Sequence, residues 1–459
     1  MSLPKNVLYT NSIESSHARN YNNHIAPQNG VNGYGGGETV IINIPSGRNL
    51  VMSGADSLLK FSVVVKNDGT ATDYIRLDKA GAHSFIQRVR VFHGSTLLSD
   101  IDNYNTLVAM MMALQTSGDS FRGKHSILSG LEELGVTYTK TTTDTYCSTM
   151  NLISGQKLTS AQVAGNGTTA SKTFTVPIMN FLSYSDKYIP LFAMTGAPLR
   201  IEIQLVSNPQ LGLCSHTSLD SLTVNDVEYI CNFMEISDSG MSIIQNALQG
   251  QPLKWVVQDY RNYGHSATVN SGVQLSVPLP AKFNSLRSLF VAFRENYAGI
   301  DTFFPLESTH FELSEYNFRL GSKTVPTKAP SSVPEFFGEL VRAIGCVSDL
   351  NHEPSINLDS YDVALPPTSD ENGTVGNNET ATQPNSYSKP SSFYVGLDLE
   401  SYSNSGMNDV YQGYNSSTDD IFFNPKFGTL AAAHNIRIDT FAYFDQVIVI
   451  ENGFCSVQY

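Results

Sequence analysis

The stretch SLRSLFVAFR, residues 285–294, decides the fold because the chain holds a counterpart of it, SLLKFSVVVK, at residues 57–66. Both are apolar runs that end on a cation, and they lie 228 residues apart (Ser57 against Ser285). Two more pairs keep the same order: residues 89–95 with 316–322, 227 apart, and residues 182–185 with 400–403, 218 apart. Self-similarity at a nearly fixed spacing sets the number of structural units. The sequence therefore predicts two copies of one domain.

The composition is that of a globular chain with few charges: 459 residues, 41% hydrophobic, 15% charged and a net charge of −14. This length suits two domains of roughly 200 residues. Without any basic run, the acidic balance argues against a nucleic-acid-binding surface. We expect neither a cleavable signal nor a membrane span, since no apolar run approaches ~20 residues. The cysteines are odd in number and form no CxxC pair, which favours free thiols in a reducing compartment: Cys147, Cys214, Cys231, Cys346 and Cys455.

The first half of the chain is predicted to be an arm followed by a β-domain. Residues 1–38, rich in Asn, Ser, Tyr and Gly, predict an extended N-terminal arm. Residues 39–236 predict the first domain, with a helix at 103–115 and a long loop at 119–171. Leu107, Met110, Met111 and Leu114 form the apolar stripe of that helix. Strands are predicted at 39–44, 57–66, 74–77, 84–92, 95–98, 172–178, 199–206 and 224–233.

The second half repeats this plan after a connection. Residues 237–253 predict a connecting helix and linker, and residues 254–459 the second domain. Its helix is capped at Ser331 or Ser332, with Phe336, Phe337, Leu340 and Ile344 on its apolar face. Residues 347–391 predict a second long loop, and such loops are usually functional. Strands are predicted at 256–263, 273–279, 286–294, 310–320, 435–444 and 446–451.

This pattern predicts an all-β fold of two tandem eight-stranded antiparallel jelly rolls, each with one helix and one long loop. Eight short strands with one helix suit two four-stranded sheets that bury a shared core. The alternative is an immunoglobulin-like sandwich, which would have no helix and would carry a buried Cys and Trp signature. That signature is absent from the sequence.

Catalytic and metal-binding motifs were sought without success, so we predict no catalytic, cofactor-binding or metal-binding residue. Gly321-Ser322-Lys323-Thr324 has the end of a phosphate-binding loop but lacks its first Gly, and its flanks predict strands instead of a helix N-terminus. The histidines include no HExxH and no pair at helical spacing. The carboxylate pairs Glu132-Glu133 and Asp419-Asp420 are typical of solvated loops. There is no GxSxG elbow. Four sequons mark predicted outer surface and are expected by chance: Asn166, Asn372, Asn378 and Asn415.

The tandem arrangement resembles the double jelly-roll major capsid proteins of the adenovirus lineage, in particular those of polinton-like, adintovirus-like and adomavirus-like DNA viruses. Four segments carry this resemblance, and together with the domain order they cover residues 39–459. They are residues 286–294, residues 316–322, the helix at 334–340 and the closing residues 441–453. None is a catalytic motif.

The resemblance implies a homotrimer of six similar lobes, a pseudo-hexagonal capsomer that tiles an icosahedral virus shell. Implied partners are neighbouring capsomers, minor capsid or penton proteins and an internal membrane beneath the N-terminal arm, with no sequence-specific nucleic acid. The implied location is the capsid of the virion, assembled inside the host cell, with the two long loops on its outer face.

Two other functions stay open on the sequence alone. One is a carbohydrate- or receptor-binding β-sandwich, such as a lectin-like spike, which would need aromatic platforms; the only tryptophan is Trp255. The other is a cupin-type enzyme, which would need two or three histidines on neighbouring strands. His83 and His93 are too far apart on one predicted strand to share a metal.

Overall fold

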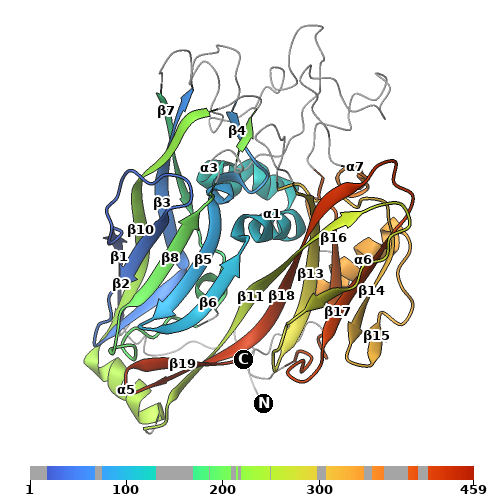
Figure 1. The fold of residues 1–459 in the computed structure, drawn as a ribbon. Helices are drawn as coiled ribbons and strands as arrows, with labels where there is room; N and C mark the ends of the chain where they lie inside the picture. Colours follow the sequence, from blue (N-terminus) through green and yellow to red (C-terminus); the bar gives the residue numbers. More distant parts are fainter. Residues whose placement is uncertain are drawn as a thin grey trace, which may run out of the picture.

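The computed structural model contains two β-sandwiches that stand side by side (Figure 1). It describes residues 18–67, 75–130, 169–185, 187–207, 213–215, 219–248, 250–296, 306–345, 354–365, 391–401 and 412–459. Every strand ladder of the sandwiches is antiparallel. The fold is therefore the double jelly roll that the sequence predicts.

The first sandwich consists of two four-stranded sheets. One has the order β1 (Ala18–Ile25), β10 (Leu219–Ile236), β3 (Leu50–Asn67) and β7 (Thr169–Val176). The other has the order β2 (Thr39–Ile44), β8 (Leu199–Leu205), β5 (Ile86–His93) and β6 (Thr96–Asp102). A short ribbon pairs β4 (Ile75–Leu77) with β9 (Leu213–Ser215).

The second sandwich has the same plan. Its first sheet has the order β11 (Leu253–Val269), β18 (His434–Glu451), β13 (Leu286–Glu295) and β16 (Tyr394–Asp398), and β19 (Phe454–Gln458) also pairs with β18. Its second sheet has the order β12 (Val277–Leu279), β17 (Ile421–Phe427), β14 (Leu313–Leu320) and β15 (Lys323–Val325).

The two strand orders confirm the internal repeat. The stretch at 57–66 lies in β3 and that at 285–294 covers β13, and each strand lies between the last long strand of its sandwich and the strand that follows the helix. The second pair of segments forms β5 and β14, each of which ends in a hairpin turn. Gly94 and Gly321 occupy these turns with φ of 60° and 58°, a conformation that favours glycine.

Each strand buries one of its faces, and the alternating burial along the strands shows this. In β2, Val40, Ile42 and Ile44 are buried while the residues between them are partly exposed. Its partner β8 shows the same alternation in register, from Thr39↔Gln204 to Ile44↔Leu199. Side chains of opposite faces alternate along a strand, so the two sheets place their apolar faces toward a common core.

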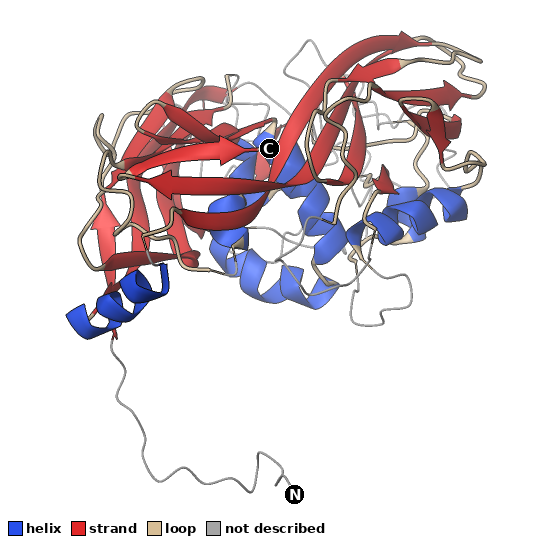
Figure 2. Ribbon diagram, turned by 90° about the horizontal axis from the view of Figure 1, so that it is seen from below, coloured by secondary structure: helices blue, strands red, loops and turns tan. Residues whose placement is uncertain are grey.

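The helices lie on one side of the strands when the molecule is viewed from below (Figure 2). The two long ones are α1 (Tyr104–Gln115) and α6 (Val333–Ile344), close to the predicted bounds, and α5 (Asp238–Leu248) is the predicted connecting helix. None of the described helices is long and apolar enough to cross a membrane. The short helices are η2 (Gly81–Phe85), α2 (Gly118–Ser120), η3 (Phe121–His125), α3 (Ser126–Ser129), α4 (Phe181–Tyr184) and α7 (Leu358–Tyr361).

The predicted strands of the second sandwich need correction. Residues 435–444 and 446–451, predicted as two strands of a closing hairpin, form the single strand β18, and β18 makes the closing hairpin with β19. Strands β16 and β17 were not predicted.

Two predictions on non-strand segments also need correction. Residues 18–25, placed in the arm, form β1, whose backbone pairs with β10 from Ala18↔Ile236 to Ile25↔Tyr229. Residues 118–129, mostly placed in the first long loop, form the short helices α2, η3 and α3, which follow the extended residue Thr116 at the end of α1. The remainder of that loop (131–168), most of the second loop (346–353 and 366–390) and residues 1–17 lie outside the described residues. The domain division at 39, 237 and 254 stays a proposal.

Candidate functional site: the seam between the two sandwiches

Helix α1 is buried on all sides because it lies between the two sandwiches. All residues from Tyr104 to Leu114 are buried, not only the predicted stripe. The first sandwich covers one side of the helix, and residues of the second cover the other. The Tyr260 hydroxyl of β11 lies 3.9 Å from Met111 Sδ, and the Ser355 amide donates to the Ala113 carbonyl at 3.2 Å. We call the contact region between the sandwiches the seam.

The seam is apolar at α1 and polar at its ends. At one end Lys79 is partly buried, and its ammonium group donates to the Ser391 carbonyl, the Ser392 hydroxyl and the Tyr394 hydroxyl at 2.7, 2.8 and 2.9 Å. Burial lowers the pKa of Lys79 to about 8, against the opposing effect of Glu307 and Asp78. Asp78 also accepts from the Leu306 amide at 2.9 Å. Three donors on one cation thus join residues 79 and 391–394, far apart in sequence.

A second polar contact lies at the start of α1. Asn103 has a left-handed φ of 48°, and its side chain does not cap the helix. Its amide instead donates to Asp439 of β18 at 3.2 Å. Arg294 and Arg437 also bond Asp439, at 2.5 and 3.0 Å. Burial alone would raise the pKa of Asp439, but the two guanidinium groups outweigh it and lower this pKa. The carboxylate therefore stays charged inside the seam.

The lower part of the seam is formed by long strands of the second sandwich (Figure 1). Gln446 of β18 donates to the Leu98 carbonyl of β6 at 3.1 Å. Trp255 of β11 is buried, and its indole N–H donates to the Ser185 hydroxyl at 2.9 Å. The only tryptophan is therefore not a surface platform for a sugar ring.

A backbone hydrogen bond closes the seam near the C-terminus. The Gly196 amide donates to the Gly453 carbonyl at 2.9 Å. A Cβ on Gly196 would come within 2.7 Å of the Phe454 ring. The close approach of the two chain segments therefore requires glycine at 196.

Asp259 is another buried acid of the seam, and it differs from Asp439 in the direction of its pKa shift. It lies on β11, and burial raises its pKa to about 7, with the Ser99 hydroxyl and the Tyr260 amide opposing the rise only in part. Its Oδ1 has no hydrogen-bond partner among the described residues. An acid of this kind makes the seam sensitive to pH near neutrality.

The residues considered for chemistry do not converge. Gly321 and Lys323 lie at a strand-to-strand turn, as predicted. His83 lies in the helix η2 instead of the predicted strand, and burial lowers its pKa to about 3, whereas His93 ends β5. Within the described ranges no three His, Cys, Asp or Glu side chains are grouped to hold a metal ion. Burial raises the pKa of the free thiols Cys231 and Cys455 to about 12 each.

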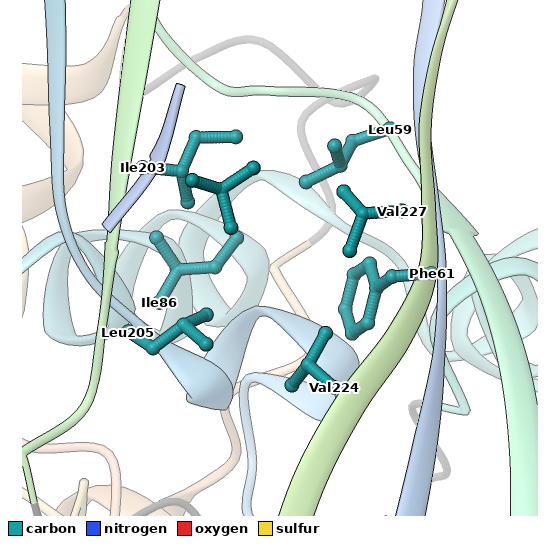
Figure 3. A pocket seen from close by; sticks show the side chains of 8 residues that line it. Leu59, Phe61, Ile86, Ile203, Leu205, Val224 and Val227 are labelled. Atoms are coloured by element: carbon teal, nitrogen blue, oxygen red, sulfur yellow. The ribbon is translucent and has the colours of Figure 1, made fainter. Parts of the chain in front are cut away.

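A cavity inside the first sandwich is too small for a ligand (Figure 3). Its volume is about 10 Å³, near the least space that a water molecule needs. The lining offers no polar group, so the cavity belongs to the core. It is lined by Val40, Leu59, Phe61, Ile86, Ile203, Leu205, Val224 and Val227.

Comparison with known proteins identifies the family. The sequence matches the family described as "Major capsid protein N-terminus" over residues 16–245, half of the chain. The chain belongs to this family of viral major capsid proteins. It forms the virus capsid and acts there as a structural protein. By sequence, no curated protein matches it.

Solved capsid structures share the whole fold at low sequence identity. The PBCV-1 virus capsid is similar with a TM-score of 0.60 and 11% identity, covering 98% of this chain and 99% of that one. The Sputnik virophage structure gives 0.60 and 10%, covering 99% and 91%. The mavirus major capsid protein gives 0.54 and 11%, covering 100% and 94%. The double jelly roll is thus common to these capsid proteins and this chain.

The sequence did not indicate the residues of the seam. Lys79 and Asp259 lie in no motif, and their partners are distant in sequence. One signal was available for Asp439: it is a charged residue that follows Ile438 and precedes the apolar run at 441–444, and such a charge needs partners when it is buried.

Proposed function

We propose that this major capsid protein builds homotrimeric capsomers, in which six similar sandwiches form a pseudo-hexagonal ring that tiles an icosahedral shell. The observation that carries the proposal is the seam. It joins unlike surfaces of two like sandwiches, the helix side of the first and the β11–β18 side of the second. A contact between unlike surfaces can be repeated head to tail until a ring closes.

The proposed role is structural, without covalent chemistry. The proposed partners are the chain itself, neighbouring capsomers and minor capsid or penton proteins. An internal membrane is a further proposed partner of the N-terminal arm, and the two long loops are proposed to face outward. The net charge of −14 supports a body without sequence-specific affinity for nucleic acid.

Light scattering after size exclusion tests the trimer. Three chains of 50.2 kDa would give a mass of about 150 kDa. A compact particle of that mass that associates into shells supports the proposal. A stable monomer of one chain mass that forms no particles contradicts it.

A further inference from the structure

The equivalent helices of the two sandwiches differ in burial. Helix α1 is buried along its length because the second sandwich covers its outer side. In α6 only Phe336, Leu340 and Ala343 are buried. Its other apolar residues are partly exposed: Val333, Phe337, Val341 and Ile344. Phe337 lies edge-on to Tyr361 of α7, and Val333 and Ile344 pack in part against the core, so these residues have partial cover from their own sandwich only. The second sandwich therefore carries a helix in the position of α1 without the cover that α1 has.

The strand before each helix shows the same difference. In β6, Leu98, Ser99 and Ile101 are buried, and Gln446 of the second sandwich bonds its backbone. In β15, which has the equivalent place, Lys323 and Thr324 are exposed and Val325 is partly exposed. We call α6 together with β15 the helix face.

The opposite side of each sandwich differs in the complementary sense. In β18, residues from Ile436 to Ile450 are buried on both faces of the strand, apart from three partly buried positions. The equivalent strand β10 alternates instead: Tyr229, Cys231 and Phe233 are buried, whereas Ile230, Asn232 and Met234 are partly exposed. Strand β1 beside it is exposed along Arg19–His24. We call β1 and the outward side of β10 the strand face.

We infer that the helix face of one copy packs against the strand face of a second copy and so repeats the seam between subunits. The operation that relates the first sandwich to the second would place the strand face of a neighbour on α6. Each copy then supplies the cover that the other lacks. This inference rests on the proposed function, and it names the surfaces through which the chain meets itself.

The two faces have the composition of an interface. Ile230 and Met234 are the apolar residues of the strand face, where they lie opposite His24 and Asn20 of β1. A charged group lies beside them, in which Glu228 bonds Lys60 at 3.1 Å and His24 at 3.2 Å. On the helix face, Val333 and Val341 lie beside the ion pair of Arg342 and Glu339, 2.8 Å apart. Apolar centres with charged rims are usual in specific interfaces.

Two single substitutions test the pairing. Val341→Asp places a charge on the helix face, and Ile230→Asp places one on the strand face. Both side chains are partly exposed in one chain, so each variant is expected to fold and to unfold in a cooperative thermal transition. Each alone is expected to reduce the mass from about three chains to one. Ile243→Asp on α5, where the side chain is 65% exposed, is the matched control and should leave the trimer intact.

Mixing the two variants gives the sharper test. The Val341→Asp chain keeps its strand face and the Ile230→Asp chain keeps its helix face. The mixture should therefore form a dimer of about 100 kDa, twice the 50.2 kDa chain, that cannot grow further. Trimers that persist in either single variant, or a mixture that stays monomeric by sedimentation at high concentration, would overturn the inference. If a variant fails to fold, Val341→Ser and Ile230→Ser replace the charges, with a measurably weaker trimer expected.

The outcomes separate the two levels of the account. A wild-type chain that is monomeric contradicts the proposed function itself. A trimeric wild type whose variants remain trimeric contradicts only the assignment of these faces.

Discussion

Replacement of Asp259 by Asn should remove a loss of stability that the seam undergoes as the pH rises. The carboxyl group is 1% exposed, and burial raises its pKa from 3.8 to about 7. The folded chain therefore holds this proton at pH values where the unfolded chain has released it. The stabilising effect of the protonated acid is complete below pH 3.8 and is lost as the pH rises through 7. The difference between these two pKa values corresponds to about 4 kcal/mol in the free energy of unfolding.

Calorimetry of both proteins between pH 4 and pH 8 would measure this effect at one fixed protein concentration, since association shifts the transition. The difference in thermal midpoint, Asn variant minus wild type, should grow by several degrees up to about pH 7 and then level off. Groups such as Asp439, whose lowered pKa acts in the opposite direction, are common to both proteins and cancel. Asp226→Asn, at an exposed aspartate, is the control. A difference for Asp259→Asn that is flat with pH would refute the reasoning.

Three further predictions follow from the packing. Arg294→Met leaves the buried Asp439 carboxylate with one guanidinium partner fewer and should lower the free energy of unfolding by about 3 kcal/mol. The double variant with Asp439→Asn should recover most of this loss. Denaturant unfolding measures both effects. Phe61→Ala in the first sandwich and Phe293→Ala in the second should each lower the free energy of unfolding by about 3 to 5 kcal/mol. Because the seam couples the sandwiches, each substitution should lower the midpoint of one common calorimetric transition. Two transitions that shift independently would contradict the coupling. Deletion of residues 2–17 should leave the trimer intact but reduce the number of closed particles. A longer deletion that also removes β1 should abolish the trimer as well. Light scattering measures the trimer, and negative-stain images show the particles.

The repeated strands β3 and β13, the strands β5 and β14, and the helices α1 and α6 could be predicted because each depends on local sequence. The runs in β3 and β13 carry apolar residues, and the glycines after β5 and β14 permit the turns. The strand β1 was missed because its polar residues show no alternation of apolar and polar positions, and it is held mainly by backbone pairing with β10. The repeat contained a signal for it. The second domain was predicted to begin with a strand near residue 256, so its counterpart had to lie before residue 39.

The seam could not be predicted because it depends on how two complete sandwiches are placed. The spacing of Leu107, Met110, Met111 and Leu114 indicates one apolar face for α1. Only the second sandwich explains why the opposite face is buried too. The same holds for Lys79, whose three acceptors lie over 300 residues away.

End-on class averages of the purified oligomer by electron microscopy would show the number of chains and the order of their lobes in one view. We expect three chains around a threefold axis, with six lobes in which first and second sandwiches alternate. Particles with two lobes only, or rings in which like sandwiches meet across a twofold contact, would contradict this expectation.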